Sequence, residues 1–232
     1  MNKLANLIID DCSKIINNKI FNDLNNKTIL ITGATGLIGH YLIATLDNIN
    51  KNGINPTMLY VIYQSDPPFY FNDLCTNLNV EFIKGDLTDD IFLKELPKAD
   101  IIIHAAGYGQ PGKFMHDKIK TIELNTKATI ATLNKLNPDG KYVFLSTSEV
   151  YNGLTTPPFN ENQIGTTDPS NERSCYIEGK RCGEAIVNAY NLKGIRENAI
   201  QIISNKTLNT SYLNSIKYYS TYDNGYKCIP LP

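Results

Sequence analysis

Apolar residues along this chain follow two alternating patterns. Short runs rich in β-branched residues, bounded by polar or glycine-containing turns, are typical of buried strands, and longer segments with apolar residues three or four apart are typical of helices. The first pattern predicts strands near 28–32, 57–63, 80–84, 100–104 and 141–146, with a sixth candidate at 199–203. The second predicts helices near 3–17, 37–50, 88–95, 115–136 and 174–193.

This alternation of strands and helices predicts an α/β fold. Right-handed crossovers between the strands give a doubly wound parallel sheet, in which ligands bind at the carboxyl ends of the strands. We expect residues 1–195 to form this domain, with its first helix preceding the sheet and residues 152–173 forming a loop. The polar Asn/Ser/Tyr-rich residues 196–232 form a divergent or truncated tail, which we expect to be loosely ordered or irregularly packed.

Composition and charge narrow the classes of partner. The 232 residues carry a net charge of −1 with no basic block, which gives no electrostatic case for nucleic-acid binding. No apolar stretch approaches a membrane span, and the early Asp10-Asp11 argues against a signal peptide. We therefore expect a cytoplasmic protein without a membrane partner. The five cysteines form no C-x-x-C motif, so we expect reduced thiols and no metal site; they stand at positions 12, 75, 175, 182 and 228.

A glycine-rich turn follows the first predicted strand. The segment 28–39 ends in G-x-x-G-x-x-G, a variant of the dinucleotide-binding fingerprint, and an apolar-periodic helix starts directly after the second glycine. Gly33 permits the tight turn, Gly36 lets the backbone approach a pyrophosphate, and Gly39 lets the helix pack close to the strand. The first N–H groups of the helix, near Leu37 and Ile38, favour phosphate. The segment predicts a Rossmann-like dinucleotide site.

Further candidates for this site follow the third and fourth predicted strands. Asp86, followed by Leu87, is placed to accept a hydrogen bond from an adenine amino group, although a helix N-cap run is an equally good interpretation of the Thr88 and Asp89 beside it. The fourth strand ends in small residues, which let a cofactor pass over it: Ala105, Ala106 and Gly107. We interpret the preceding His104 as a packed histidine. Asn125 is predicted on the core-facing side of a helix, where a polar side chain is unusual, so we include it among the candidates for cofactor binding.

The fifth predicted strand ends in hydroxyl and carboxyl groups. Thr147, Ser148 and Glu149 follow it at the position expected for a substrate. Hydroxyl residues there are also ordinary turn residues. That alternative does not explain a glutamate beside the cofactor, so we include all three among the candidate catalytic residues.

Tyr176 and Lys180 are the most informative pair in the chain. Residues four apart share one face of a helix. A tyrosine with a pKa of about 10 is a poor base at neutral pH, and a cation held nearby moves that pKa toward the working range. A Tyr-x-x-x-Lys pair also arises by chance on solvated helices. Its place after a glycine-rich nucleotide segment makes Tyr176 and Lys180 candidates for both catalysis and cofactor binding.

Together these motifs resemble the extended short-chain dehydrogenase/reductase family, the NAD-dependent epimerases and dehydratases of nucleotide sugars. The resemblance covers about residues 27–195. The runs Ser-Thr-Ser-Glu-Val-Tyr and Tyr-x-Glu-Gly-Lys-Arg are most similar to UDP-glucuronate decarboxylases. The resemblance implies Thr147 as the hydroxyl that binds the sugar O4, Tyr176 as the base with Lys180 as its partner, and Ser148 with Glu149 as the Ser-Glu pair. The 4,6-dehydratases also carry a glutamate here.

The chain departs from the family pattern in two places. The second predicted strand lacks the acidic residue that binds the adenosine ribose, and Asp66 follows it late, so NAD is preferred and NADP is not excluded. Residues 196–232 lack the family's Arg-x-x-x-x-Tyr-Gly-Pro-like segment and the lid that follows it. The substrate domain is therefore expected to be largely missing. A nucleotide sugar, foremost a UDP-sugar, is the implied partner, and a homodimer is a candidate assembly.

The resemblance implies oxidation at the sugar C4. A 4-ketone then lets a C5 carboxylate leave as carbon dioxide, or lets Glu149 remove the C5 proton for elimination. Two alternatives remain open. One is an enzyme that acts as a decarboxylase, or else as a 4,6-dehydratase or epimerase. The other is an inactive NAD-binding remnant that acts as an interaction module.

Overall fold

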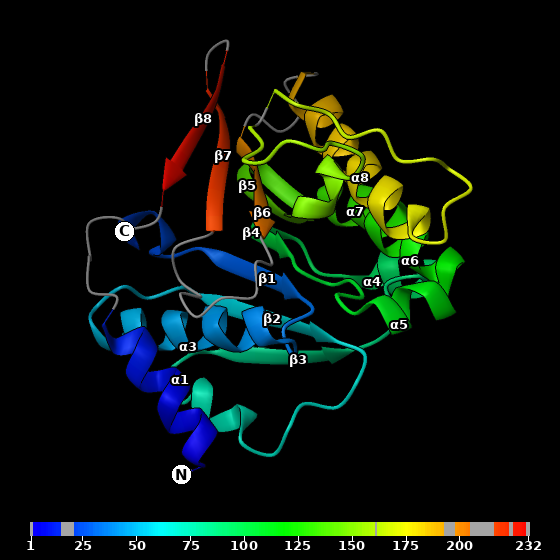
Figure 1. Ribbon diagram of the computed structural model, residues 1–232. Coiled ribbons are helices and arrows are strands. Elements are labelled where there is room, and N and C mark those ends of the chain that lie inside the picture. The colour runs from blue at the N-terminus through cyan, green and yellow to red at the C-terminus, as the bar shows by residue number, and fades with distance from the viewer. Residues whose placement is uncertain are drawn as a thin grey trace. The chain divides into compact units, whose positions relative to one another are not determined.

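The computed structural model describes residues 2–14, 21–160, 162–192, 198–204, 216–222 and 225–230 (Figure 1). The chain divides into two compact units. The first unit comprises residues 1–106 and 135–137, and the second comprises residues 107–134 and 138–232. The glycine-rich segment belongs to the first unit, and the Tyr-x-x-x-Lys pair belongs to the second.

The first unit alternates strands and helices in the predicted order. Its elements are α1 (Lys3–Ser13), η1 (Asn22–Leu24), β1 (Thr28–Thr32), α3 (Leu37–Lys51), β2 (Met58–Tyr63), η2 (Phe71–Leu74), β3 (Val80–Lys84), α4 (Asp90–Glu95) and β4 (Ala99–His104). The strands lie in the order β3-β2-β1-β4, and each neighbouring pair is parallel. The predicted α/β fold with a parallel sheet is confirmed.

Apolar spacing explains how α3 covers the sheet. Its buried positions recur every three or four residues, as in a helix with one face on a core. Ile43 and Ile49 pack with Ile29 and Ile31 of β1 in one hydrophobic cluster, and α1 adds Ile8 to that cluster. The helix that follows the glycine-rich turn is thus packed against the core over the residues beyond its first turn.

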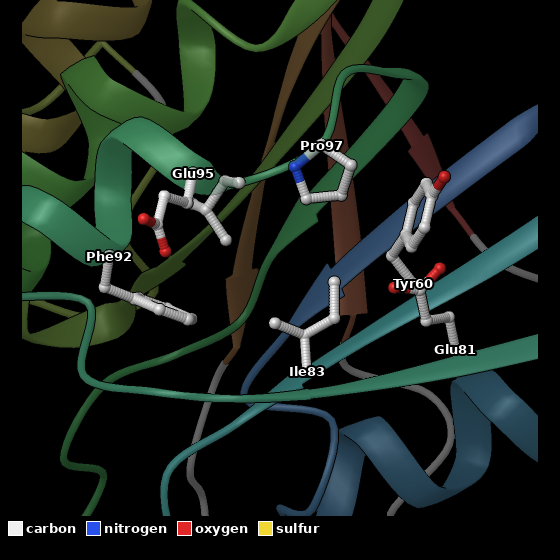
Figure 2. A pocket seen from close by; sticks show the side chains of 7 residues that line it. Tyr60, Glu81, Ile83, Phe92, Glu95 and Pro97 are labelled. Carbon is white, nitrogen blue, oxygen red and sulfur yellow. The ribbon is translucent and has the colours of Figure 1, made fainter.

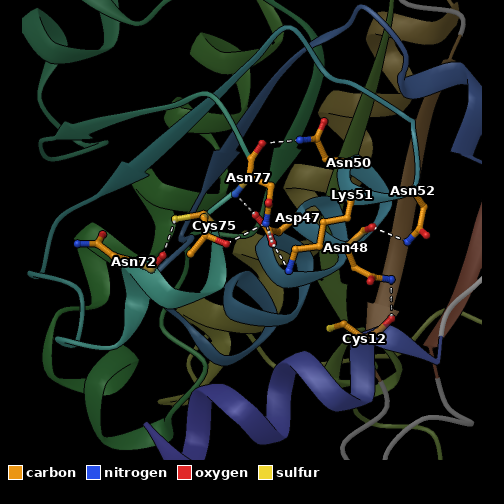
Figure 3. Close-up of polar contacts among 10 residues, drawn as sticks. Cys12, Asp47, Asn48, Asn50, Lys51, Asn52, Asn72, Cys75 and Asn77 are labelled. Atoms are coloured by element: carbon orange, nitrogen blue, oxygen red, sulfur yellow. Dashed lines mark hydrogen bonds and ion pairs between the residues drawn. The ribbon is translucent and has the colours of Figure 1, made fainter. Parts of the chain in front are cut away.

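A buried carboxylate ties α3 to the segment that leads into β3. Asp47, 4 % exposed, accepts hydrogen bonds from the backbone N–H of Asn77 at 2.6 Å and from its side-chain amide at 2.8 Å (Figure 3). Lys51 pairs with the same carboxylate at 3.3 Å. Nearby, burial raises the pKa of Cys75 to about 11, so this thiol stays protonated at neutral pH.

The second unit contains the remaining elements. They are α5 (Pro111–His116), α6 (Lys118–Asn125), α7 (Lys127–Leu133), β5 (Leu136–Thr147, in this unit from Pro138 onward), η3 (Ser148–Tyr151), α8 (Ser174–Leu192), β6 (Asn198–Ser204), β7 (Ile216–Tyr222) and β8 (Gly225–Pro230). β5 and β6 are parallel, whereas β6, β7 and β8 form an antiparallel meander. The sixth predicted strand is therefore confirmed as β6.

Three predictions about elements need correction. The helix predicted over 115–136 is divided into α5, α6 and α7, and Leu136 already begins β5. Asp117 causes the first break, because it leaves helical geometry and its carboxylate caps α6 through the Lys120 N–H at 3.2 Å. The tail is not irregular throughout, since 216–222 and 225–230 are paired strands. The N-terminal helix ends at Ser13, and the rest of its predicted range, from residue 15, lies outside the described residues.

Candidate active site

The glycine-rich segment of the first unit has no room for side chains at two of its three glycines. Gly33 adopts a φ of +67°, and a Cβ there would lie 2.7 Å from the backbone of Ala105 and Ala106. A Cβ on Gly39 would lie 2.2 Å from the carbonyl oxygen of Ala34. Contacts this short do not occur between real atoms, so only glycine fits. The turn and the close packing of helix on strand that the sequence predicts are both present.

Gly36 differs from the other two glycines because it borders open space. A Cβ there would meet only the Gly33 carbonyl oxygen, at 3.2 Å. Gly36 is also the N-cap of α3, and no side chain caps this helix; the first helical residue, Leu37, is 70 % exposed. An uncapped start of a 15-residue helix presents N–H donors and positive potential to an anion. These features fit the pyrophosphate of a dinucleotide.

Thr32 links the ends of β1 and β4. Its hydroxyl lies 2.8 Å from Nδ1 of His104 and accepts the Ala106 N–H at 3.1 Å. His104 is 1 % exposed, so its interpretation as a packed histidine is confirmed. These bonds fix the small residues Ala105 and Ala106 against Gly33, where a side chain would obstruct the turn.

Asp86 already has partners in the first unit. Its carboxylate accepts from the side-chain amide of Gln64 at 2.7 Å and from the N–H and hydroxyl of Thr88 at 2.9 and 2.8 Å. Asp89 caps α4 by accepting from two N–H groups, and Leu87 is 6 % exposed and buried in the core. Asp66, which follows β2, pairs instead with Lys84 at 2.6 Å. Gln64, which the sequence did not single out, is the polar group that joins the end of β2 to Asp86.

The first unit also has a groove of about 280 Å³, formed by β2, β3 and α4. Figure 2 shows Ile83 and Phe92 facing it, with Glu81 and Glu95 at its margins. None of the residues predicted for the cofactor or the catalytic site lines this groove.

In the second unit, one face of α8 is fixed to the end of β5. Tyr176, Lys180 and Glu184 recur every four residues on that face and bind three consecutive residues of β5. The Lys180 ammonium donates to the Leu145 carbonyl oxygen at 2.6 Å, and Ser146 donates to Glu184. The Thr147 hydroxyl lies close enough to the Tyr176 phenol to lower its pKa. The structure therefore brings Tyr176, Lys180 and Thr147 together.

Burial dominates the electrostatics of this pair. Tyr176 is 9 % exposed, and burial is the chief cause that raises its pKa. The Thr147 hydroxyl lowers the pKa, but by less than burial raises it. Burial also lowers the pKa of Lys180 to about 8. The ammonium points to the Leu145 carbonyl and lies 4.8 Å from the centre of the Phe144 ring. The expectation that the pKa of Tyr176 is moved down toward the working range is therefore wrong for the chain in this state, because desolvation raises it.

Glu149 lies in η3, directly after Thr147 and Ser148. Its carboxylate accepts from Nε of Arg173 at 3.2 Å and from Nη2 of the same side chain, and its N–H donates to the Thr147 hydroxyl at 3.3 Å. Ser148, the first residue of η3, is partly exposed. The sequence did not single out Arg173. Its position three residues before Tyr176 is the signal that was available.

Asn125 and Gly107 lie beside Lys180. Asn125 is fully buried, and its amide donates to the Thr121 carbonyl oxygen at 2.8 Å, whereas its Oδ1 has no hydrogen-bond partner in the part of the chain described. A Cβ on Gly107 would lie 3.6 Å from Nζ of Lys180 and 4.0 Å from this oxygen. A buried acceptor without a partner is costly. This acceptor, with the bare backbone beside it, fits a site that receives a polar group of a bound ligand.

The described residues form neither a metal-binding cluster nor a membrane-spanning helix. They contain no cluster of three or more His, Cys, Asp or Glu side chains that could hold a metal ion. No helix within the described ranges is long and apolar enough to cross a bilayer. Cys12, Cys75, Cys175 and Cys182 are free thiols.

Comparisons with known proteins agree with this architecture. Residues 29–206 match the model of the NAD dependent epimerase/dehydratase family. UDP-glucuronic acid decarboxylase 6 of Arabidopsis thaliana is 30 % identical over 199 residues, which cover 85 % of this chain and 54 % of the relative. UDP-glucuronic acid decarboxylase 1 of Danio rerio is 31 % identical over 180 residues, 74 % of this chain and 40 % of the relative. The chain thus spans about half the length of the curated relatives it matches.

A solved structure shares the fold. MoeE5 in complex with UDP-glucuronic acid and NAD has a TM-score of 0.56 and 21 % identity, over 76 % of this chain and 52 % of that one. The family match covers the glycine-rich segment of the first unit and the tyrosine helix of the second. This chain belongs to the NAD dependent epimerase/dehydratase family.

Proposed function

We propose that this chain carries the catalytic groups of an NAD-dependent nucleotide-sugar enzyme that oxidises its substrate at the sugar C4 and releases carbon dioxide from a UDP-linked uronic acid. The observation that carries the proposal is the buried group formed by Tyr176, Thr147 and Lys180: the Thr147 hydroxyl acts on the Tyr176 phenol, and Lys180, on the same helix face, donates to the Leu145 carbonyl oxygen at 2.6 Å. A hydroxyl at the end of β5, with a phenol and an ammonium on the helix packed against it, matches the acid/base machinery that oxidation of an alcohol requires.

Each of the three residues has a separate role. The Tyr176 phenolate takes the proton of the C4 hydroxyl and becomes the phenol, and the Thr147 hydroxyl holds the sugar oxygen in line. Lys180 supplies positive charge that favours the phenolate; its pKa of about 8 keeps it mostly protonated at neutral pH. NAD, when bound, would supply the hydride acceptor for this oxidation and the hydride donor for the return step. The glycine-rich turn and the uncapped start of α3 would hold its pyrophosphate.

Support for decarboxylation comes from Glu149 and from the relatives. A ketone at C4 makes a C5 carboxylate a β-keto acid, which loses carbon dioxide readily, so the enzyme needs only to hold the acid and exclude competing reactions. Ser148 and Glu149 follow Thr147 at the position where the sugar would extend beyond C4. Relatives at about 30 % identity carry the name UDP-glucuronic acid decarboxylase.

Two other functions compete with this proposal. Glu149 is also the group that a 4,6-dehydratase would use to remove the C5 proton, and an epimerase needs only the tyrosine and the cofactor. Alternatively, these 232 residues bind NAD without turnover and act as an interaction module. The four free thiols favour a reducing compartment such as the cytoplasm.

A substrate panel separates these functions. The chain is incubated with NAD and, in turn, UDP-glucuronate, UDP-glucose and a TDP-hexose, and products are identified by mass spectrometry. NAD binding is measured in parallel by calorimetry, with Tyr176→Phe as the control. Carbon dioxide loss from UDP-glucuronate alone supports the proposal. Loss of water or a change of sugar configuration supports the dehydratase or epimerase, and NAD binding without any product supports the module.

A further inference from the structure

Arg173 contacts both Glu149 and the start of the helix that carries Tyr176, all in the second unit. Its backbone carbonyl accepts the N–H groups of Tyr176 at 3.0 Å and of Ile177 at 3.1 Å, so its backbone starts the helix that carries the phenol. Its side chain turns to Glu149 and donates from two nitrogens to two carboxylate oxygens. Such two-point pairing fixes the orientation of a carboxylate as well as its charge balance.

An aromatic ring connects Arg173 to the phenol. The guanidinium carbon lies 5.2 Å from the centre of the Phe114 ring. The Phe114 ring in turn stacks on the Tyr176 ring, with centroids 4.6 Å apart and planes 7° from parallel. Phe114 is 1 % exposed. One continuous row of contacts therefore runs from Glu149 through Arg173 and Phe114 to Tyr176. A movement of the arginine would alter the surroundings of both the carboxylate and the phenol.

The charges around the phenol oppose one another. Burial and the Thr147 hydroxyl are the two largest influences on the pKa of Tyr176. Two charged groups also affect it: Glu149 raises this pKa and Arg173 lowers it. The charged groups on α8 have other partners: Lys180 donates to the Leu145 carbonyl, Glu184 accepts from Ser146, and Arg181 pairs with Glu178. Glu149 and Arg173 thus act on this phenol with opposite signs.

We propose that Arg173 is a positioning residue: it holds the Glu149 carboxylate in one orientation and offsets the negative charge that this carboxylate places beside Tyr176. The catalytic value of this role rests on the proposed function, in which Tyr176 acts as a base. Arg173 then lets the acidic Glu149 stand next to that base without suppressing formation of the phenolate. Without Arg173, Glu149 would be free to turn toward the phenol, and its charge would act unopposed.

The test measures the ionisation of Tyr176 and needs no turnover. The chain has 14 tyrosines and no tryptophan, so tyrosinate absorbance is not overlaid by indole. Each variant is titrated beside its Tyr176→Phe counterpart, and the difference reports Tyr176 alone. We expect Arg173→Met to raise the Tyr176 midpoint by roughly one pH unit, the scale expected for loss of a neighbouring opposite charge. Adding Glu149→Gln should return the midpoint toward that of the wild type.

Two further variants separate positioning from a merely structural role. Arg173→Lys keeps the charge and should leave the midpoint close to that of the wild type. Lys118→Met removes an equal charge from an exposed position of α6 in the same unit and should not move the midpoint. Where Arg173→Met does not fold, as judged by circular dichroism, Arg173→Gln takes its place.

An unmoved midpoint in the folded Arg173 variant, or a shift that Glu149→Gln does not reverse, overturns the proposal. Absence of turnover in the wild type would refute the proposed function while leaving this titration intact. With an active preparation, Arg173→Met should lower kcat more than it changes KM and should move the onset of activity to higher pH.

Discussion

Replacing Lys180 with methionine tests the electrostatics of the site through folding alone. The ammonium is 5 % exposed, and burial lowers its pKa from 10.5 to about 8. A shift of that size corresponds to a cost of about 3 kcal/mol for keeping the buried amine charged. Below pH 8 both the folded and the unfolded chain bind the proton, so the wild type carries the full cost.

The sign of the pH dependence follows from linkage. Between pH 8 and 10.5 the folded chain releases the proton before the unfolded chain does, so stability rises with pH. Lys180→Met lacks this gain. The free energy of unfolding of the wild type relative to the variant should therefore increase across this interval, by up to about 3 kcal/mol.

Urea unfolding of both proteins at pH 7, 8, 9 and 10 measures this difference, and the titrations of all other groups cancel when the two are subtracted. Lys135→Met is the matched control, because Lys135 also donates to a backbone carbonyl, that of Lys94 at 2.6 Å, but at an exposed position. A difference that stays constant over the whole range would show that Lys180 is not buried as a cation, and the reasoning would fail.

Three further predictions test the remaining parts of the site. Gly36→Val should abolish NAD binding by calorimetry yet leave the circular dichroism spectrum intact, whereas Gly39→Ala should destabilise the fold, because its Cβ would lie 2.2 Å from a backbone oxygen; equal effects on folding would contradict this. Tyr176→Phe should retain NAD but lower turnover on the order of a hundredfold, and near-normal turnover would exclude it as the base. Burial lowers the pKa of His40, whose Nε2 has no partner among the described residues, so stability should fall as the pH drops below 6.5. His40→Leu should weaken that loss in urea unfolding at pH 5 and 7, and an unchanged pH dependence would refute it.

Local geometry explains what could be predicted from the sequence. The roles of Gly33 and Gly39 depend on spacing between one strand and one helix, and the strand and helix over 28–50 are nearly as expected. The shared face of Tyr176 and Lys180 needs only the helix period. The parallel pairing of strands in the first unit follows from the alternation of strands and helices along the sequence, together with the general right-handedness of the crossovers between parallel strands.

Tertiary contacts explain what could not be predicted. Arg173 lies 24 residues after Glu149, and Phe114 lies 62 residues before Tyr176, so no local period marks either contact. The sign of the Tyr176 shift depends on desolvation, which spacing on a helix does not reveal. Glu184 was within reach, because it continues the four-residue spacing of Tyr176 and Lys180 on α8.

Deuterium at C4 of UDP-glucuronate tests the central claim most directly. The chain is incubated with NAD and the labelled sugar nucleotide, and the product is examined by mass spectrometry and NMR. The account predicts a product that has lost carbon dioxide, retains its deuterium at C4, and forms more slowly than from unlabelled substrate. Deuterium lost to solvent, or bound NAD with no product at all, would contradict the claim that these residues oxidise a sugar at C4.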